Sequence, residues 1–290
     1  MTPTTGPPTT VPPTTVPPTT GPPTTGPATP APAPVPSLAV RARDVLACEW
    51  TKLVSVRSTF WTMLIAVVTP VAISALVAAT LGSAPQRGAP IDPLLPGLLS
   101  LEYAVLSVAV LGVLAFSTEY GTGLIRTTFA AMPRRRAVLA AKAGVLGLVT
   151  MAAGELVAFV SFFLVQAILS GHHLGVSLSA PGVPGAVLAE GLLLFVVAML
   201  GLAVGAIVRH TAGGIAAVIG VIILPGILAV LPAPWGARLG RFTLVDAAHQ
   251  VTALHPATNL FAPALSLVVL LAWPALALLA AALMITRRDA

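Results

Sequence analysis

The sequence predicts an all-α fold: a polytopic membrane protein with six transmembrane helices, an N-terminal interfacial helix and a cytoplasmic helix between spans two and three. Two observations carry this prediction. Only 8% of the 290 residues are charged and 57% are hydrophobic, whereas a soluble domain has roughly 25% charged residues. Moreover, several segments stay mainly apolar over about 20 residues, the length that crosses roughly 30 Å of hydrocarbon.

The six predicted spans are long apolar runs that contain at most one charged residue each. They cover residues 60–82, 97–117, 144–170, 186–208, 211–231 and 263–286. Three spans contain a single acid, namely Glu102, Glu155 and Glu190. Pro70 and Pro225 predict kinks in their helices, and the pair Gly201 and Gly205 predicts close packing of one helix against another.

Residues 1–37 differ from the rest of the chain. They are built on the repeat GPPTT VPPTT VPPTT GPPTT and contain 14 of the 28 prolines. Proline removes the backbone donors that helices and sheets need, and the segment has too few apolar residues to form a core. The sequence therefore predicts a disordered cytoplasmic tail over 1–37, followed by one six-span membrane domain over 38–290.

The segment between this tail and the first span has the pattern of an amphipathic helix. Apolar residues share one face of a helical wheel and charged residues the other, with Ala42, Leu46, Trp50 and Leu53 against Arg41, Asp44 and Lys52. Such a pattern is typical of a helix that lies in the membrane interface.

The distribution of Lys and Arg predicts the orientation. If the N-terminus lies inside the cell, twelve basic residues fall on the cytoplasmic side and three, Arg87, Arg238 and Arg241, fall on the opposite side. The positive-inside rule favours this arrangement. We therefore expect a multi-pass protein of the plasma membrane with both termini in the cytoplasm, where its basic residues contact lipid headgroups and not nucleic acid.

The most polar stretch within the apolar region is EYGTGLIRTTFAAMPRRR, residues 119–136. Its apolar residues recur at helical spacing and predict a short amphipathic helix over 122–132. Gly121 and Thr122 suit the helix start, and Pro133 ends the helix because it forces the preceding residue out of the α region. The apolar stripe must be buried either among lipid headgroups or in a groove of a partner protein.

Two motifs resemble a known family. The stretch CEWTKLVSVRSTFWTML before span one and the stretch STEYGTGLIRTTFAAMPRRRAVLAAK after span two are similar to the permease subunits of type-2 ABC exporters, especially the actinobacterial ones. The resemblance implies that the helix after span two is the coupling helix, which docks on a separate ATP-hydrolysing subunit.

Carried over residue by residue, the resemblance implies a docking surface and a hinge. The docking residues would be Gly123, Ile125, Arg126, Thr127, Thr128 and Phe129, and the hinge at the membrane border would be Glu119 with Tyr120. The implied partners are a cytoplasmic nucleotide-binding ATPase subunit and a second permease, either another copy or a paralogue.

The sequence predicts that this chain is not itself an enzyme and needs no cofactor. A G-x-x-x-x-G-K-[ST] loop for ATP phosphates is missing, since neither of the two lysines, Lys52 and Lys142, follows a glycine. The histidines lie in loops without a third ligand, and Cys48 is the only cysteine, so we expect no metal site and no catalytic residue.

The acids of the spans support an alternative function. Glu155 lies near the middle of span three, where an ionised carboxylate costs about 2.5 to 3.5 kcal/mol, so it either bonds to a neighbouring helix or lines a transport path. Glu102 and Glu190, nearer the outer surface, could reach headgroup water at the mouth of such a path. One alternative function is therefore a secondary transporter or channel with Glu155 as its ion or proton site. A further alternative is a non-transporting anchor that presents the proline-rich tail to a cytoplasmic partner.

Overall fold

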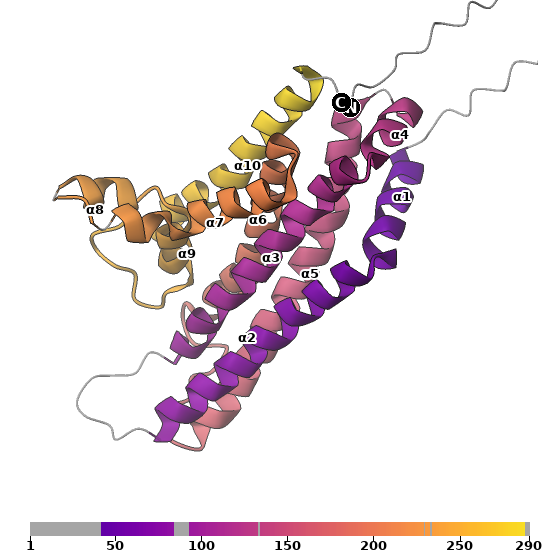
Figure 1. The fold of residues 1–290 in the computed structure, drawn as a ribbon. Helices are drawn as coiled ribbons and strands as arrows, with labels where there is room; N and C mark the ends of the chain where they lie inside the picture. The colour runs from indigo at the N-terminus through magenta and orange to yellow at the C-terminus, as the bar shows by residue number, and fades with distance from the viewer. Residues whose placement is uncertain (1–41, 84–92, 133, 229, 233, 288–290) are drawn as a thin grey trace, which may run out of the picture. The chain divides into compact units, whose positions relative to one another are not determined.

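The computed structural model describes residues 42–83, 93–132, 134–228, 230–232 and 234–287, and these residues form helices joined by turns, without a strand (Figure 1). The predicted tail over 1–37 and the residues Arg41, Arg87 and Arg288 lie outside this range. The described helices are α1 Ala42–Ser55, α2 Arg57–Ser83, α3 Leu95–Gly121, α4 Leu124–Ala131, α5 Arg135–Ser170, α6 Val183–Val208, α7 Thr211–Leu228, α8 Trp235–Gly240, α9 Leu244–Thr252 and α10 Pro263–Arg287.

Within the described chain, five helices are long and apolar enough to cross a membrane, namely α2, α3, α5, α6 and α10. They coincide with five of the six predicted spans. Helix α7 is shorter: its 18 residues, Thr211–Leu228, reach about 27 Å at 1.5 Å per residue, which is slightly less than the roughly 30 Å of hydrocarbon. A crossing by α7 therefore stays a prediction.

Helix α6 forms the centre of the bundle. It packs against α3, α5 and α10, and α2 lies beside α3 and α5 (Figure 1). The core of α6 is continuous, since Val196, Val197 and Ala198 are fully buried in succession. A helix that is apolar on all sides suits this central place, because each of its faces meets another helix and not water.

Glycines let α3 and α6 approach each other closely. A methyl group on Gly201 would lie 2.5 Å from the carbonyl oxygen of Ala109, and one on Gly205 would lie 2.7 Å from that of Val113. From the other side, a methyl group on Gly112 would meet the carbonyl oxygen of Ala198. The predicted packing role of Gly201 and Gly205 is thus confirmed, and Gly112 completes the contact on α3.

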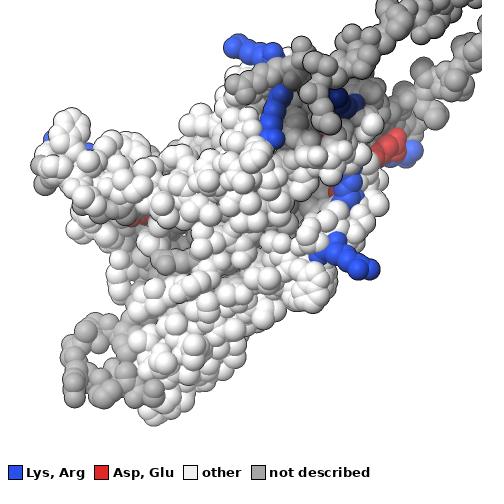
Figure 2. Space-filling model, viewed as in Figure 1, with Lys and Arg blue, Asp and Glu red and all other residues white. Residues whose placement is uncertain are grey.

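The helix ends gather at two opposite ends of the bundle. At one end, Thr211 donates to the hydroxyl of Ser117 at 3.1 Å and Arg135 Nη1 donates to the carbonyl of Ile285 at 3.3 Å. At the other, Gln166 Nε2 donates to the carbonyl of Pro93 at 3.2 Å. Figure 2 shows Lys and Arg collected mainly at the first end, around α1, α4 and the end of α10, which we call the basic end.

The glycine contact gives a first prediction. Gly201→Ala should destabilise the protein by about 1 to 3 kcal/mol, the usual effect of overpacking, because the new methyl group must displace α3. Thermal unfolding of the purified chain in detergent measures this change. Gly220→Ala in α7 is the matched control, since nothing lies within 4 Å of its added methyl group. Equal stability of the two variants would contradict the close α3–α6 contact.

Candidate functional site

Helix α4 is set apart from α3 by a glycine turn. Gly123 adopts a left-handed backbone conformation with φ of 73°, which reverses the chain after α3 and starts α4 at Leu124. The helix therefore begins two residues later than predicted, because Thr122 still bonds back to the carbonyl of Thr118 in the last turn of α3. At its other end, Met132 is extended with ψ of 95°, as a residue before proline should be.

The predicted docking residues divide between the two faces of α4. Ile125 and Phe129 are only 2% and 9% exposed, and both pack into the core of this chain. Gly123, Arg126 and Thr127 are exposed, while Thr128 is half-buried. Ile125 and Phe129 thus lie on the inner face of α4 and Leu124 on its exposed face, and docking by the predicted residues stays a prediction.

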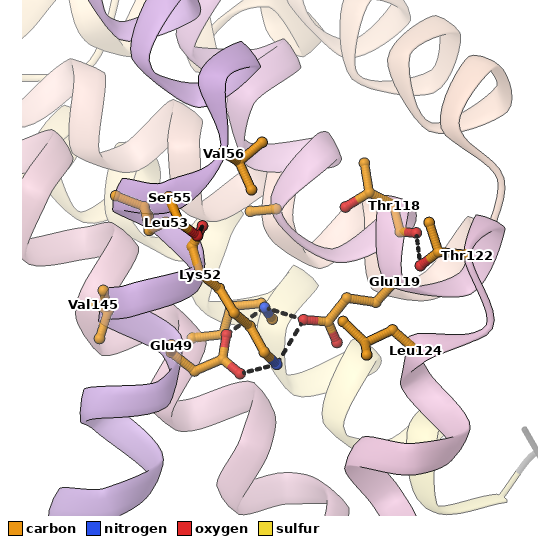
Figure 3. A pocket seen from close by; sticks show the side chains of 12 residues that line it. Glu49, Lys52, Leu53, Ser55, Val56, Thr118, Glu119, Thr122, Leu124 and Val145 are labelled. Carbon is orange, nitrogen blue, oxygen red and sulfur yellow. Dashed lines mark hydrogen bonds and ion pairs between the residues drawn. The ribbon is translucent and has the colours of Figure 1, made fainter.

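Directly behind α4, four charged side chains form a closed ring, shown in Figure 3. Lys52 donates to Glu49 Oε1 at 2.8 Å and to Glu119 Oε1 at 3.0 Å. Lys142 donates to Glu49 Oε2 at 2.5 Å and to Glu119 Oε1 at 2.9 Å. Each ammonium therefore contacts both carboxylates, and the formal charges of the ring sum to zero.

The ring joins three helices that are distant in the sequence. Glu49 and Lys52 lie one turn apart on α1, Glu119 lies in the last turn of α3, and Lys142 lies two turns into α5. Glu49, Glu119 and Lys142 are buried. Buried charges are tolerated only when they are paired, so the position of each helix depends on the other two.

Lys52 is the member of the ring nearest to solvent, with a side chain 26% exposed. Burial disfavours its charged form, but the hydrogen bonds and charges of Glu49 and Glu119 outweigh burial, and the pKa of Lys52 is raised above its ordinary value of 10.5. A raised pKa means that the stability contributed by Lys52 is fully present below pH 10.5. This contribution is lost only as the pH rises through the higher pKa of the folded state.

Two cavities flank the ring. One, of about 350 Å³, opens between α1, α3 and α5 and is shown in Figure 3. The second, of about 340 Å³, separates α1 from α4 and is lined by Cys48 on one side and by Thr127 and Met132 on the other. Glu49, Lys52 and Leu124 border both cavities. The ring therefore lies at the base of a groove between α1 and the exposed face of α4.

The two predicted hinge residues lie in the last turn of α3. Glu119 belongs to the ring, and its second oxygen, Oε2, is buried and has no hydrogen-bond partner among the described residues. The Tyr120 ring is tilted by 38° against that of Phe116, with 5.8 Å between the ring centroids, and the Arg209 guanidinium lies 5.1 Å from the centroid of the Tyr120 ring. The helix continues through both residues and breaks only at Gly123, so a hinge movement at Glu119 and Tyr120 stays a prediction.

The three acids of the spans occupy different surroundings. Glu190 is buried beside Gly97 and Gln166, next to a cavity of about 10 Å³ that has room for at most about one water molecule. The expectation that Glu190 reaches headgroup water is therefore wrong in this conformation. Glu155 is half-buried against Gly191, and within the described part of the chain its buried Oε2 has no hydrogen-bond partner. The side chain of Glu102 lies outside the described part of the structure.

The sequence analysis missed Glu49, Lys52 and Lys142 as members of one site. A signal for Lys142 was present, because it lies at helical spacing between the apolar positions Val138 and Leu146. A lysine that continues the apolar face of a predicted span just before its start at residue 144 calls for an acidic partner if that face is buried. The sequence could not identify the partner, because Glu49 is 93 residues away from Lys142.

Comparison with known proteins leaves the family open. No family model matches the chain, and no curated protein matches it either. Among the described residues, no group of three His, Cys, Asp or Glu side chains could hold a metal ion. The residues and geometry of α4 and of the ring are therefore the features from which function can be inferred.

The ring gives a second prediction. Lys142→Met should destabilise the folded chain by about 3 to 5 kcal/mol, because it leaves Glu49 and Glu119 buried with one ammonium between them. Lys52→Met should cost less, since water can reach the carboxylates at that side. Chemical unfolding of the purified chain in detergent micelles measures both changes.

The control replaces all four charges together by apolar residues: Glu49→Leu, Lys52→Met, Glu119→Leu and Lys142→Met. Removing every charge leaves no unpaired ion, so this variant should recover most of the stability lost in Lys142→Met. If Lys142→Met unfolds like the wild-type chain, the ring does not hold α1, α3 and α5 together.

Proposed function

We propose that this protein is the membrane-spanning permease subunit of an ATP-driven exporter, with α4 as the coupling helix that docks on a separate cytoplasmic ATPase. In this proposal the chain lies in the plasma membrane with the basic end in the cytoplasm. A second permease, either a copy or a paralogue, completes the transport path. Export uses energy from the ATPase, and this chain contributes no catalytic residue.

The observation that carries the proposal is that α4 packs against the core with one face and is exposed on the other. Its inner residues Ile125 and Phe129 are anchored in the core, and the ion-pair ring behind it fixes α3 and α5. The outer residues Leu124, Arg126 and Thr127 stay exposed, and Leu124 has 44% of its surface accessible. A short helix that is held rigidly on one side and left open on the other is suited to transmit the movement of a bound partner.

The ring also indicates how such a movement would reach the spans. A displacement of α4 pulls on the end of α3 through the two-residue link Thr122–Gly123. Glu119 passes the displacement to Lys142 on α5 and to Lys52 on α1, because their ion pairs are buried and costly to break. Helices α1, α3 and α5 would therefore tilt together when the ATPase pair closes, which is the rigid-body change that alternating access needs.

The docking proposal gives a third prediction. Arg126→Ala should reduce the amount of ATPase that co-purifies with the chain by about tenfold or more, the effect expected for an arginine in an interface. The partner is first identified by mild-detergent pull-down and mass spectrometry as a soluble protein with a phosphate-binding loop. The yield of the chain in the membrane fraction should stay at the wild-type level.

Two control variants accompany this experiment. Phe129→Ala should lower the stability of the chain itself by about 3 to 5 kcal/mol, because Phe129 is buried in the core. Arg238→Ala, on α8 and away from the basic end, should retain the partner fully. Wild-type recovery of the ATPase with Arg126→Ala would exclude docking through the outer face of α4.

A second candidate function, secondary transport, is favoured by one observation. The buried Oε2 of Glu155 lacks a hydrogen-bond partner in the described structure, as a carboxyl group that takes up an ion or a proton could. The helix partner, Gly191 on α6, offers no side chain to satisfy it. An ion-coupled transporter would work without an ATPase, which separates the two candidates.

Our proposal gives a fourth prediction about Glu155. In proteoliposomes that contain this chain alone, an imposed pH gradient should decay at the same rate with the wild-type chain, with Glu155→Gln and with lipid only. The reason is that a permease without its ATPase does not couple transport to a proton gradient. Faster decay with the wild-type chain that is abolished by Glu155→Gln would favour the secondary transporter instead.

A further inference from the structure

Three arginines, Arg134, Arg135 and Arg136, follow Pro133 at the basic end. Arg134 is the N-cap residue of α5, and Arg135 and Arg136 begin the helix. Arg134 and Arg136 are exposed, and none of the described acidic side chains forms an ion pair with either of them. Two guanidinium groups therefore face outward at the basic end without a described counter-charge.

These arginines border an open recess of about 540 Å³, lined by Arg134, Arg135, Arg136, Ala137 and Thr286. One wall is the first turn of α5 and the other is the last turn of α10. Arg135 connects the walls, because its Nη1 donates to the carbonyl of Ile285 and its guanidinium lies 5.3 Å from the centroid of the Phe129 ring. Arg135 thus fixes the shape of the recess, and Arg134 and Arg136 supply its exposed charge.

The recess lies where two apolar helices end together. Helix α5 begins at Arg135 with apolar residues from Ala137 onward, and α10 ends at Arg287. The orientation predicted by the positive-inside rule would place these arginines on the headgroup side of the apolar parts of both helices. The guanidinium group binds a phosphate with paired N–H donors and is less strongly hydrated than an ammonium, so arginine suits phosphate at this depth.

An apolar stripe leads away from the recess along α10. On the same face of α10 as Thr286, and before it in the sequence, lie Leu283, Leu279 and Leu276 at helical spacing. All three are exposed, with accessible fractions of 41%, 57% and 66%. A free phosphate or an acidic protein surface would leave this stripe unused. A lipid would use both parts, with its phosphate at the arginines and an acyl chain along the leucines.

We propose that the recess formed by Arg134, Arg136 and the end of α10 is a binding site for an anionic phospholipid. The inference stands independently of the ATPase, because it uses neither the outer face of α4 nor the ion-pair ring. The bound lipid would bridge the start of α5 and the end of α10, beside the contact of Arg135 with Phe129. It would therefore stabilise the part of the bundle that supports α4.

The experiment measures the melting temperature of the full-length, delipidated chain in mild detergent while phosphatidylglycerol or phosphatidylcholine is added. Phosphatidylglycerol should raise the melting temperature in a saturable manner, and phosphatidylcholine should not. R134Q/R136Q should weaken the apparent affinity for phosphatidylglycerol by roughly tenfold or more, since each basic residue contributes about one kcal/mol near anionic lipid and 1.4 kcal/mol is tenfold. The matched control R238Q/R241Q removes the same charge elsewhere and should bind like the wild-type chain.

Two further arms separate the sources of the anion. Inorganic phosphate at equal concentration should leave the melting temperature unchanged, and L279Q/L283Q should weaken the effect of phosphatidylglycerol. The proposal is overturned if inorganic phosphate reproduces the shift, if phosphatidylcholine acts equally well, or if R134Q/R136Q binds phosphatidylglycerol like the wild-type chain. Loss of the co-purifying ATPase from R134Q/R136Q with unchanged lipid binding would assign the arginines to a protein surface instead.

Discussion

Four buried charges must be satisfied together at the end of the bundle that carries α1 and α4. Each of the two ammonium groups lies within 3.0 Å of both carboxylates, and Lys52 is the most exposed of the four side chains. Because a single unpaired charge would be costly at this depth, α1, α3 and α5 can only pack in the arrangement that closes the ring. The ring therefore acts as a constraint on geometry more than as a source of stability.

The placement of α4 follows from this constraint. Glu119 fixes the last turn of α3, and only Thr122 and Gly123 separate that helix from α4. The left-handed conformation at Gly123 turns the chain sharply, so Ile125 and Phe129 point into the core and Arg126 and Thr127 point out. An amphipathic helix can bury its apolar stripe in lipid or in a partner, but here its own chain covers the stripe.

Away from the ring, close packing of helix against helix holds the bundle together. Gly112, Gly201 and Gly205 remove side chains where the backbones of α3 and α6 meet, and van der Waals contact between helices replaces the hydrophobic effect that lipid does not provide. The remaining charges lie mostly at the basic end, as Figure 2 shows for one face. Two environments thus meet there: an apolar surface suited to lipid tails, and arginines suited to anionic groups.

The sequence by itself determined the features that depend on neighbouring residues. Apolar runs of about 20 residues predicted the long helices, and Pro133 predicted the extended backbone at Met132 that ends α4. The tertiary structure alone decided which side of α4 is exposed and that Glu190 is buried. It also decided that Glu49, Lys52, Glu119 and Lys142 form one ring. The reason is that hydropathy and backbone sterics act over a few residues, whereas an ion pair depends on distances that only packing sets between residues such as Glu49 and Lys142.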